Sequence, residues 1–133
     1  MRRLVLAFGA LVSTMGMAVA ADGAYRAAAE NWLSLVDHGH YADSWAQASA
    51  YFRSAITEAA WVQAVKAARE PLGTLTVRDP QAATAATTLP GAPDGEYEVL
   101  QFRSSFANKA AAVETVTLKR EGDAWKVAGY FIK

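Results

Sequence analysis

A change of hydrophobic period near Thr74 limits most strongly what this chain can fold into. Before Thr74, apolar residues recur every three to four positions, which is the spacing of one face of a helix. After Thr74 they alternate at every second position, which is the spacing of a strand with one buried face. Helices in one half of a chain and strands in the other are typical of an α+β domain. The sequence therefore predicts N-terminal helices packed on a curved antiparallel sheet of four to five strands.

Three helices are expected in the first half. The first covers the apolar positions of residues 25–36 and ends at Gly39, a residue that favours helix C-termini. A second, shorter helix fits residues 41–49. The third begins after Thr57, a typical N-cap, and ends at Pro71, which cannot continue a helix.

The expected strands are bounded by turn residues. A short strand over residues 75–77 is expected to close at Asp79-Pro80, and residues 82–89 are extended but consist mainly of Ala and Thr. The Pro- and Gly-rich run at 90–95 is a dense turn signal. Three longer strands are expected over residues 96–106, 111–120 and 124–132.

Gly122-Asp123 predicts a two-residue hairpin turn, and this turn fixes the register of the last two strands. Pairing Glu121 with Ala124 across the turn assigns every following pair, because side chains alternate between the two faces of a sheet. The more apolar face is predicted to be the core. It carries Glu114, Val116, Leu118, Trp125, Val127, Gly129 and Phe131, whereas Tyr130 and Ile132 lie on the other, more polar face. The four Trp residues of the chain are expected to pack in the core.

Glu114 is the residue of greatest chemical interest, because a carboxylate on a core face is costly unless a partner compensates its charge. A four-residue loop at 107–110 places Arg103 directly opposite Glu114, whereas a five-residue loop places Ser104 there. One interpretation is a cross-strand ion pair near the open end of the sheet. The other is a polar anchor, or a general base with a raised pKa, inside a pocket.

The N-terminus has the pattern of an export signal. Arg2-Arg3 precedes an apolar stretch at 4–12, and small residues at 18–20 match the preference of a signal peptidase. Cleavage after Ala20, or one residue later, leaves a single domain over residues 21–133 with a formal charge of −2. The apolar stretch is shorter than the ~20 residues of a membrane span. The mature protein is therefore expected to be periplasmic or secreted, without a membrane span.

Several functions are disfavoured by what the sequence lacks. The mature chain has no extended basic cluster, which argues against nucleic-acid binding. Neither a phosphate-binding Gly-rich loop nor a Ser–His–acid set is supported, so no cofactor and no catalytic residue are assigned. Two His and two Asp lie close together, but their spacing matches no closed metal site, and a helix–turn–helix corner is expected instead. These residues are Asp37, His38, His40 and Asp43.

Five segments carry a resemblance to a known family. They are DHGHYADSW at 37–45, LPGAPDGEY at 89–97, FANK at 106–109, ETVT at 114–117 and GDAWKVAGY at 122–130. In this order they resemble the exported bacterial proteins grouped as domain of unknown function 4019. The resemblance implies a fold similar to nuclear transport factor 2 and ketosteroid isomerase, in which helices and a bent sheet form a cone. It implies no activity, because that fold hosts enzymes and binding proteins alike.

The function predicted from the sequence is a non-catalytic periplasmic module that binds a small apolar ligand or a protein. Its pocket is expected to contain Glu114, Arg103 and Trp125. The alternative is an enzyme of the isomerase or dehydratase type that uses Glu114 as general base. A third possibility is a homodimer formed through the Thr-rich outer face of the sheet.

Overall fold

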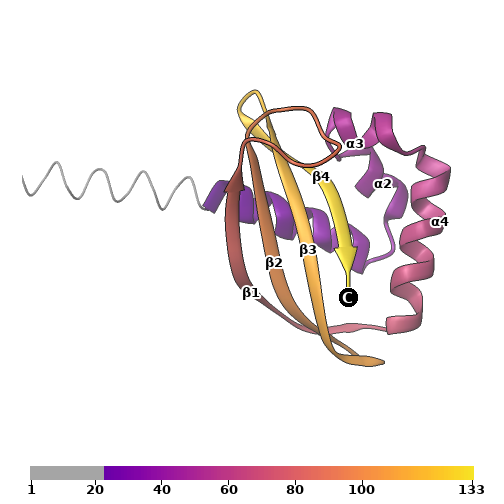
Figure 1. The fold of residues 1–133 in the computed structure, drawn as a ribbon. Coiled ribbons are helices and arrows are strands. Elements are labelled where there is room, and N and C mark those ends of the chain that lie inside the picture. The colour runs from indigo at the N-terminus through magenta and orange to yellow at the C-terminus, as the bar shows by residue number, and fades with distance from the viewer. Residues whose placement is uncertain (1–22) are drawn as a thin grey trace, which may run out of the picture.

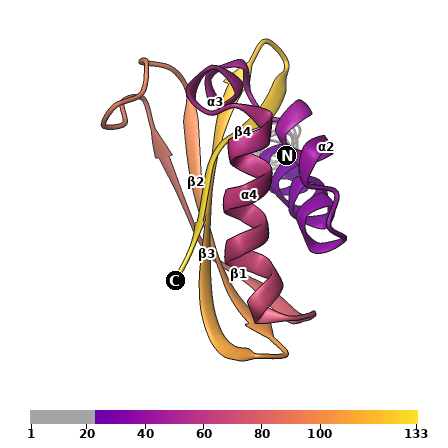
Figure 2. The same ribbon diagram turned by 90° about the vertical axis from the view of Figure 1, so that its right-hand side faces the viewer.

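The computed structural model describes residues 23–133, and the predicted signal peptide lies outside the described residues. Four helices are followed by one antiparallel sheet in the order β1-β2-β3-β4, and all helices lie on the concave side of this curved sheet (Figures 1 and 2). The predicted α+β class is confirmed, with four strands. The elements are a helix over residues 23–37, α2 (Tyr41–Ala46), α3 (Ala50–Ala55), α4 (Glu58–Arg69), the 3-10 turn η1 (Glu70–Leu72), β1 (Leu75–Ala86), β2 (Tyr97–Phe106), β3 (Lys109–Glu121) and β4 (Ala124–Ile132).

The helix ends follow the expected capping residues. Gly39 follows the first helix with a φ of 76°, in the left-handed region that favours glycine. The Thr57 hydroxyl accepts a hydrogen bond from the Ala60 amide at 3.2 Å and caps α4. The expected helix over 41–49 is divided in two, because Ser49 is extended and its hydroxyl accepts from the Phe52 amide at the start of α3. α3 was not predicted from the sequence.

The first strand was also predicted incorrectly, because Asp79-Pro80 does not close it. β1 continues through Pro80 to Ala86 and pairs with β2 along its length. Proline lacks the amide hydrogen that a central strand needs, but β1 is an edge strand and tolerates its absence. A register shift between Pro80 and Ala82 accompanies the proline.

The register of β3 and β4 was predicted correctly only near their turn. Glu121 pairs with Ala124 and Leu118 with Val127, as expected. A bulge then inserts Ala128, so every later residue of β4 changes face. Tyr130 therefore lies opposite Val116, and Ile132 rather than Phe131 lies opposite Glu114. As a consequence Tyr130 packs against the core, whereas Phe131 is 53% exposed on the convex face.

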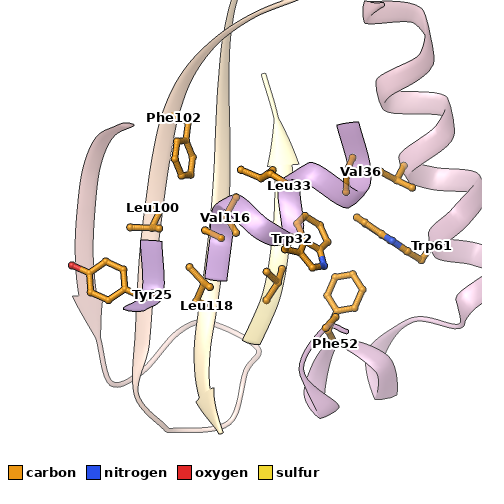
Figure 3. Close-up of a cluster of buried hydrophobic side chains, with 14 residues drawn as sticks. Tyr25, Trp32, Leu33, Val36, Phe52, Trp61, Leu100, Phe102, Val116 and Leu118 are labelled. Carbon is orange, nitrogen blue, oxygen red and sulfur yellow. The ribbon is translucent and has the colours of Figure 1, made fainter. Parts of the chain in front are cut away.

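The hydrophobic core lies between the helices and the concave face of the sheet (Figure 3). Trp32 and Trp61 are buried at its centre, and each indole donates a hydrogen bond to Ser44, to the carbonyl at 2.8 Å and to the hydroxyl at 2.9 Å respectively. The expected role of these two Trp residues in packing is confirmed. Trp125 is half-buried and packs edge-on against Tyr25 at 5.6 Å between ring centroids.

Candidate functional site

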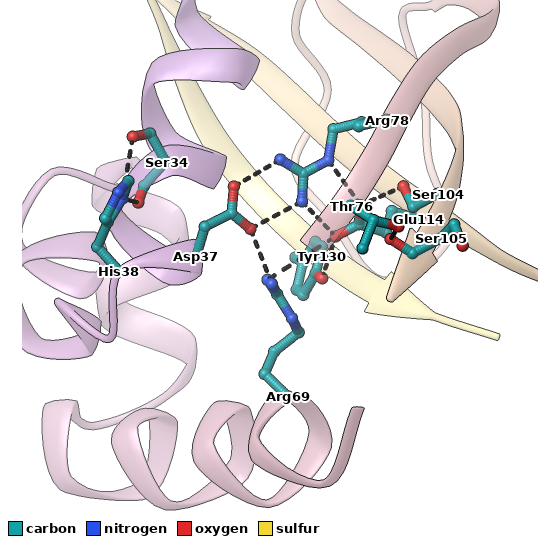
Figure 4. Close-up of polar contacts among 10 residues, drawn as sticks. All are labelled: Ser34, Asp37, His38, Arg69, Thr76, Arg78, Ser104, Ser105, Glu114 and Tyr130. Carbon is teal, nitrogen blue, oxygen red and sulfur yellow. Dashed lines mark hydrogen bonds and ion pairs between the residues drawn. The ribbon is translucent and has the colours of Figure 1, made fainter. Parts of the chain in front are cut away.

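A buried carboxylate, Glu114, lies at the centre of a polar network on the concave face of the sheet (Figure 4). Its side chain is 0% exposed. Oε1 accepts from Arg78 Nε at 2.7 Å and from the Ser104 hydroxyl at 2.5 Å. Oε2 accepts from Arg78 Nη2 at 3.1 Å and from the Tyr130 hydroxyl at 2.5 Å. Both oxygens of this carboxylate are therefore occupied by donors from three other strands.

Arg78 joins this carboxylate to a second one. Its Nη1 and Nη2 donate to the two oxygens of Asp37 at 2.7 and 2.9 Å, while its Nε and Nη2 serve Glu114. The planar guanidinium thus forms two bidentate pairs, a geometry that lysine cannot provide. Desolvation lowers the pKa of Arg78, but hydrogen bonds and the charges of both carboxylates outweigh it and raise the pKa above its ordinary value.

Asp37, at the end of the first helix, forms ion pairs with two guanidinium groups. Besides Arg78, it accepts from Arg69 Nη2 at 2.8 Å. Burial raises the pKa of Asp37, but the hydrogen bonds and charges of Arg78 and Arg69 reverse this effect and hold the pKa below its ordinary value. Asp37 is therefore ionised near neutral pH.

Arg69 reaches the network from the last turn of α4. Its side chain is 5% exposed, and its guanidinium lies over the Phe106 ring at 4.7 Å. Nη1 is 3.9 Å from Glu114 Oε2, which is an ion pair but too long for a hydrogen bond, and Nε has no hydrogen-bond partner. Arg69 is thus the least fully bonded member of the network.

The network joins every strand of the sheet to two helices, and its two arginines balance its two carboxylates. Tyr130 completes it from β4, and burial together with the charge of Glu114 raises the pKa of its hydroxyl above the ordinary value. We call these residues the concave network: Asp37, Arg69, Arg78, Ser104, Glu114 and Tyr130. A carboxylate that is buried, paired and bonded in this way holds elements together and has no free lone pair directed at a pocket.

The three residues predicted to form a pocket are not brought together. Phe102, not Arg103, lies opposite Glu114, because the loop between β2 and β3 has only two residues and β2 is bulged before Phe106. The predicted ion pair of Arg103 with Glu114 is therefore wrong, and Arg103 is exposed beside Val113. Trp125 pairs with Arg120, six residues along β3 from Glu114 and hence about 20 Å away.

Four members of the concave network were not predicted from the sequence: Asp37, Arg69, Arg78 and Tyr130. A signal for Asp37 was present, because an acidic residue at a helix C-terminus is unfavourable unless a cation compensates it. Ser104, which the sequence placed opposite Glu114 in one of two registers, bonds to Glu114 diagonally while it pairs with Ala112.

An open pocket of about 310 Å³ borders the concave network where the first helix and α4 end. We call it the rim pocket; it is lined by Val36, Asp37, His38, Gly39, Tyr41, Arg69, Glu70, Gly73 and Thr74. His38 Nδ1 contacts the Ser34 carbonyl at 2.7 Å, and His40 lies 3.8 Å from Asp43. Within residues 23–133, no three His, Cys, Asp or Glu residues cluster as metal ligands do.

A layer of helices packs on a curved four-stranded sheet, and a charged network lies between the two layers. The domain is therefore of the α+β class. The chain belongs to the family described as protein of unknown function (DUF4019), whose model matches residues 28–130. No curated protein matches the chain. None of the helices in the described part of the chain is both long and apolar enough to span a membrane.

Proposed function

We propose that this protein is an exported, non-catalytic binding module of the nuclear transport factor 2 type, and that it holds a small polar ligand in the rim pocket. The observation that supports a non-catalytic role is that both carboxylate oxygens of Glu114 already accept hydrogen bonds from other side chains. A general base must lie within hydrogen-bond reach of the substrate proton that it abstracts. Here the carboxylate accepts four hydrogen bonds and is fully buried, which argues against the alternative of a general base.

The rim pocket supports binding by its size and its lining. Its volume of about 310 Å³ lies at the lower end of the range for small-molecule sites. Charged and aromatic groups of Asp37, Arg69, Glu70 and Tyr41 line it together. The proposed ligand is therefore polar, rather than the apolar one expected from the sequence.

The pocket also shares two residues with the concave network, Asp37 and Arg69. A ligand that bonds to either group contacts a side chain whose position is fixed by bonds to other elements. Such a site is preorganised, because little conformational freedom remains to be lost on binding.

Native mass spectrometry of the protein purified from an exporting host tests this proposal. The wild type is expected to carry an added mass that unfolding removes. Thr74→Trp places a bulky side chain on the pocket wall from an exposed position and should abolish the added mass. Gln63→Trp, at an exposed position of α4 away from the pocket, is the matched control and should retain it. A wild type without added mass, or a Thr74→Trp variant that retains it, contradicts the proposal.

A further inference from the structure

The outer edge of β1 is an unpaired strand edge. β1 is an end strand and pairs only with β2 among residues 23–133. Every residue from Asp79 to Ala85 is exposed, so no helix or loop of the described chain covers this part of the strand. The other end strand differs, because the Val127 carbonyl of β4 accepts a hydrogen bond from the Ser49 amide at 2.8 Å.

The features that normally protect such an edge are confined to the first half of β1. Charged residues, proline and bulges prevent edge strands from pairing with other chains. In β1 these are Arg78, Asp79, Pro80 and the register shift that follows Pro80. Beyond that shift, residues 82–86 pair one to one with β2 and contain no charge, proline or glycine. Their backbone groups on the outer edge are thus available to another strand.

We propose that a second copy of this chain pairs with this edge, antiparallel and around a two-fold axis at Ala83, to form a continuous eight-stranded sheet. A strand edge selects a strand as its partner, because its alternating amide and carbonyl groups match only another extended backbone. A two-fold axis makes the interface self-complementary, so one segment must tolerate its own sequence in reverse.

The sequence of β1 meets that requirement at Ala83 and fails it nearer the start of the strand. With the axis at Ala83, Ala82 lies opposite Thr84 of the second copy, and neither residue carries a charge. Arg78 and Asp79 lie beyond the register shift that follows Pro80, outside the segment 82–86 centred near this axis, so no like charges are placed opposite each other there. An axis at Asp79 instead opposes two identical carboxylates, which destabilises cross-strand pairing. The charge pattern therefore selects the second half of β1.

The proposed interface is small, so the dimer is expected to dissociate readily. A pairing of this length buries less than the ~1,200 Å² of a standard stable interface. Sedimentation velocity on the purified protein, from about 1 µM to about 1 mM, covers the dissociation constants expected of such complexes. The weight-average sedimentation coefficient of the wild type is expected to rise with protein concentration, from the value of a monomer towards that of a dimer.

Two charge variants test the axis itself. Ala83→Lys or Ala83→Asp places two like charges directly opposite each other across the axis, and each variant alone should remain monomeric over the whole range. An equimolar mixture of the two opposes Lys to Asp and should restore dimers, which native mass spectrometry identifies as mixed. Because Ala83 is exposed, both variants should melt within a few degrees of the wild type.

Phe131→Lys, on the exposed convex face, separates this proposal from a dimer formed through that face. It should leave the dimer intact. A wild type that stays monomeric up to the highest concentration overturns the proposal. So does a dimer that survives Ala83→Lys, one that Phe131→Lys abolishes, or a mixture of the two Ala83 variants that stays monomeric.

Discussion

Replacing Arg78 with methionine is the most direct test of the concave network. Methionine keeps most of the side chain's apolar length but removes four hydrogen bonds, two to Glu114 and two to Asp37. Arg78 is 12% exposed and its two carboxylate partners are 0% and 15% exposed, so solvent replaces little of what is lost.

The expected cost is about 4 kcal/mol in the free energy of unfolding. Removing one partner of a buried ion pair typically costs about 3 to 5 kcal/mol, because a charge is left buried without compensation. Two carboxylates lose Arg78 here, but each keeps other donors: Glu114 retains Ser104 and Tyr130, and Asp37 retains Arg69. The cost therefore stays within the range for one pair instead of doubling.

Urea denaturation followed by tryptophan fluorescence measures this difference. Arg103→Met is the matched control on the convex face and should change the free energy of unfolding by no more than about 0.5 kcal/mol. The double variant Arg78→Met/Glu114→Gln removes one stranded charge, so its cost should fall short of the sum of the single variants by about 2 kcal/mol. A cost below about 1 kcal/mol for Arg78→Met, or strict additivity in the double variant, would show that Arg78 does not compensate the buried charge of Glu114.

Four further predictions concern single groups. The pKa of Asp37 is lowered in the folded state, so its contribution to stability is present above its ordinary pKa of 3.8 and is lost as the pH falls below that value. In acid denaturation, the free energy of unfolding of Asp37→Asn should therefore depend less steeply on pH than that of the wild type. The pKa of Tyr130 is raised in the folded state, so its contribution to stability should be lost as the pH rises above the ordinary value of 10.0. Phenolate absorbance should show that Tyr130 ionises only when the protein unfolds. Tyr130→Phe should remove this part of the loss of stability at alkaline pH. Thr57→Ala should destabilise the protein by about 1 kcal/mol in urea melts, because the cap of α4 is removed. N-terminal sequencing of the exported protein should begin at Ala21 or the next residue, and a mature chain that begins at Met1 contradicts the export signal.

The sequence predicted those features of the fold that depend on neighbouring residues. Gly39 and Thr57 mark helix ends through their own backbone and side-chain chemistry, and both do so in the structure. Gly122-Asp123 sets the turn between β3 and β4, and the pairs nearest to it follow by counting. The α+β class follows from the change in hydrophobic period, which is likewise a local property.

The candidate site was beyond such reasoning, because it depends on register. One extra residue, Ala128, transfers Tyr130 to the concave face, and no local pattern distinguishes it from its neighbours. The loop between β2 and β3 is two residues shorter than counted and β2 is bulged before Phe106, and the net shift of one position moves Arg103 to the convex face. Arg78 was not a candidate because its strand was expected to end beside it. Each error of one position exchanges the two faces of a strand, and with them the partners of Glu114.

The concave network also has a consequence for the kinetics of folding. Its ion pairs close loops of 41 residues between Asp37 and Arg78 and 36 residues between Arg78 and Glu114. Contacts of such long range carry a large entropic cost of loop closure, so we expect this network to form after the folding transition state. Interactions formed after that barrier slow unfolding and leave the folding rate nearly unchanged. We therefore expect the ion pairs of Arg78 to govern how long the protein remains folded much more than how quickly it folds.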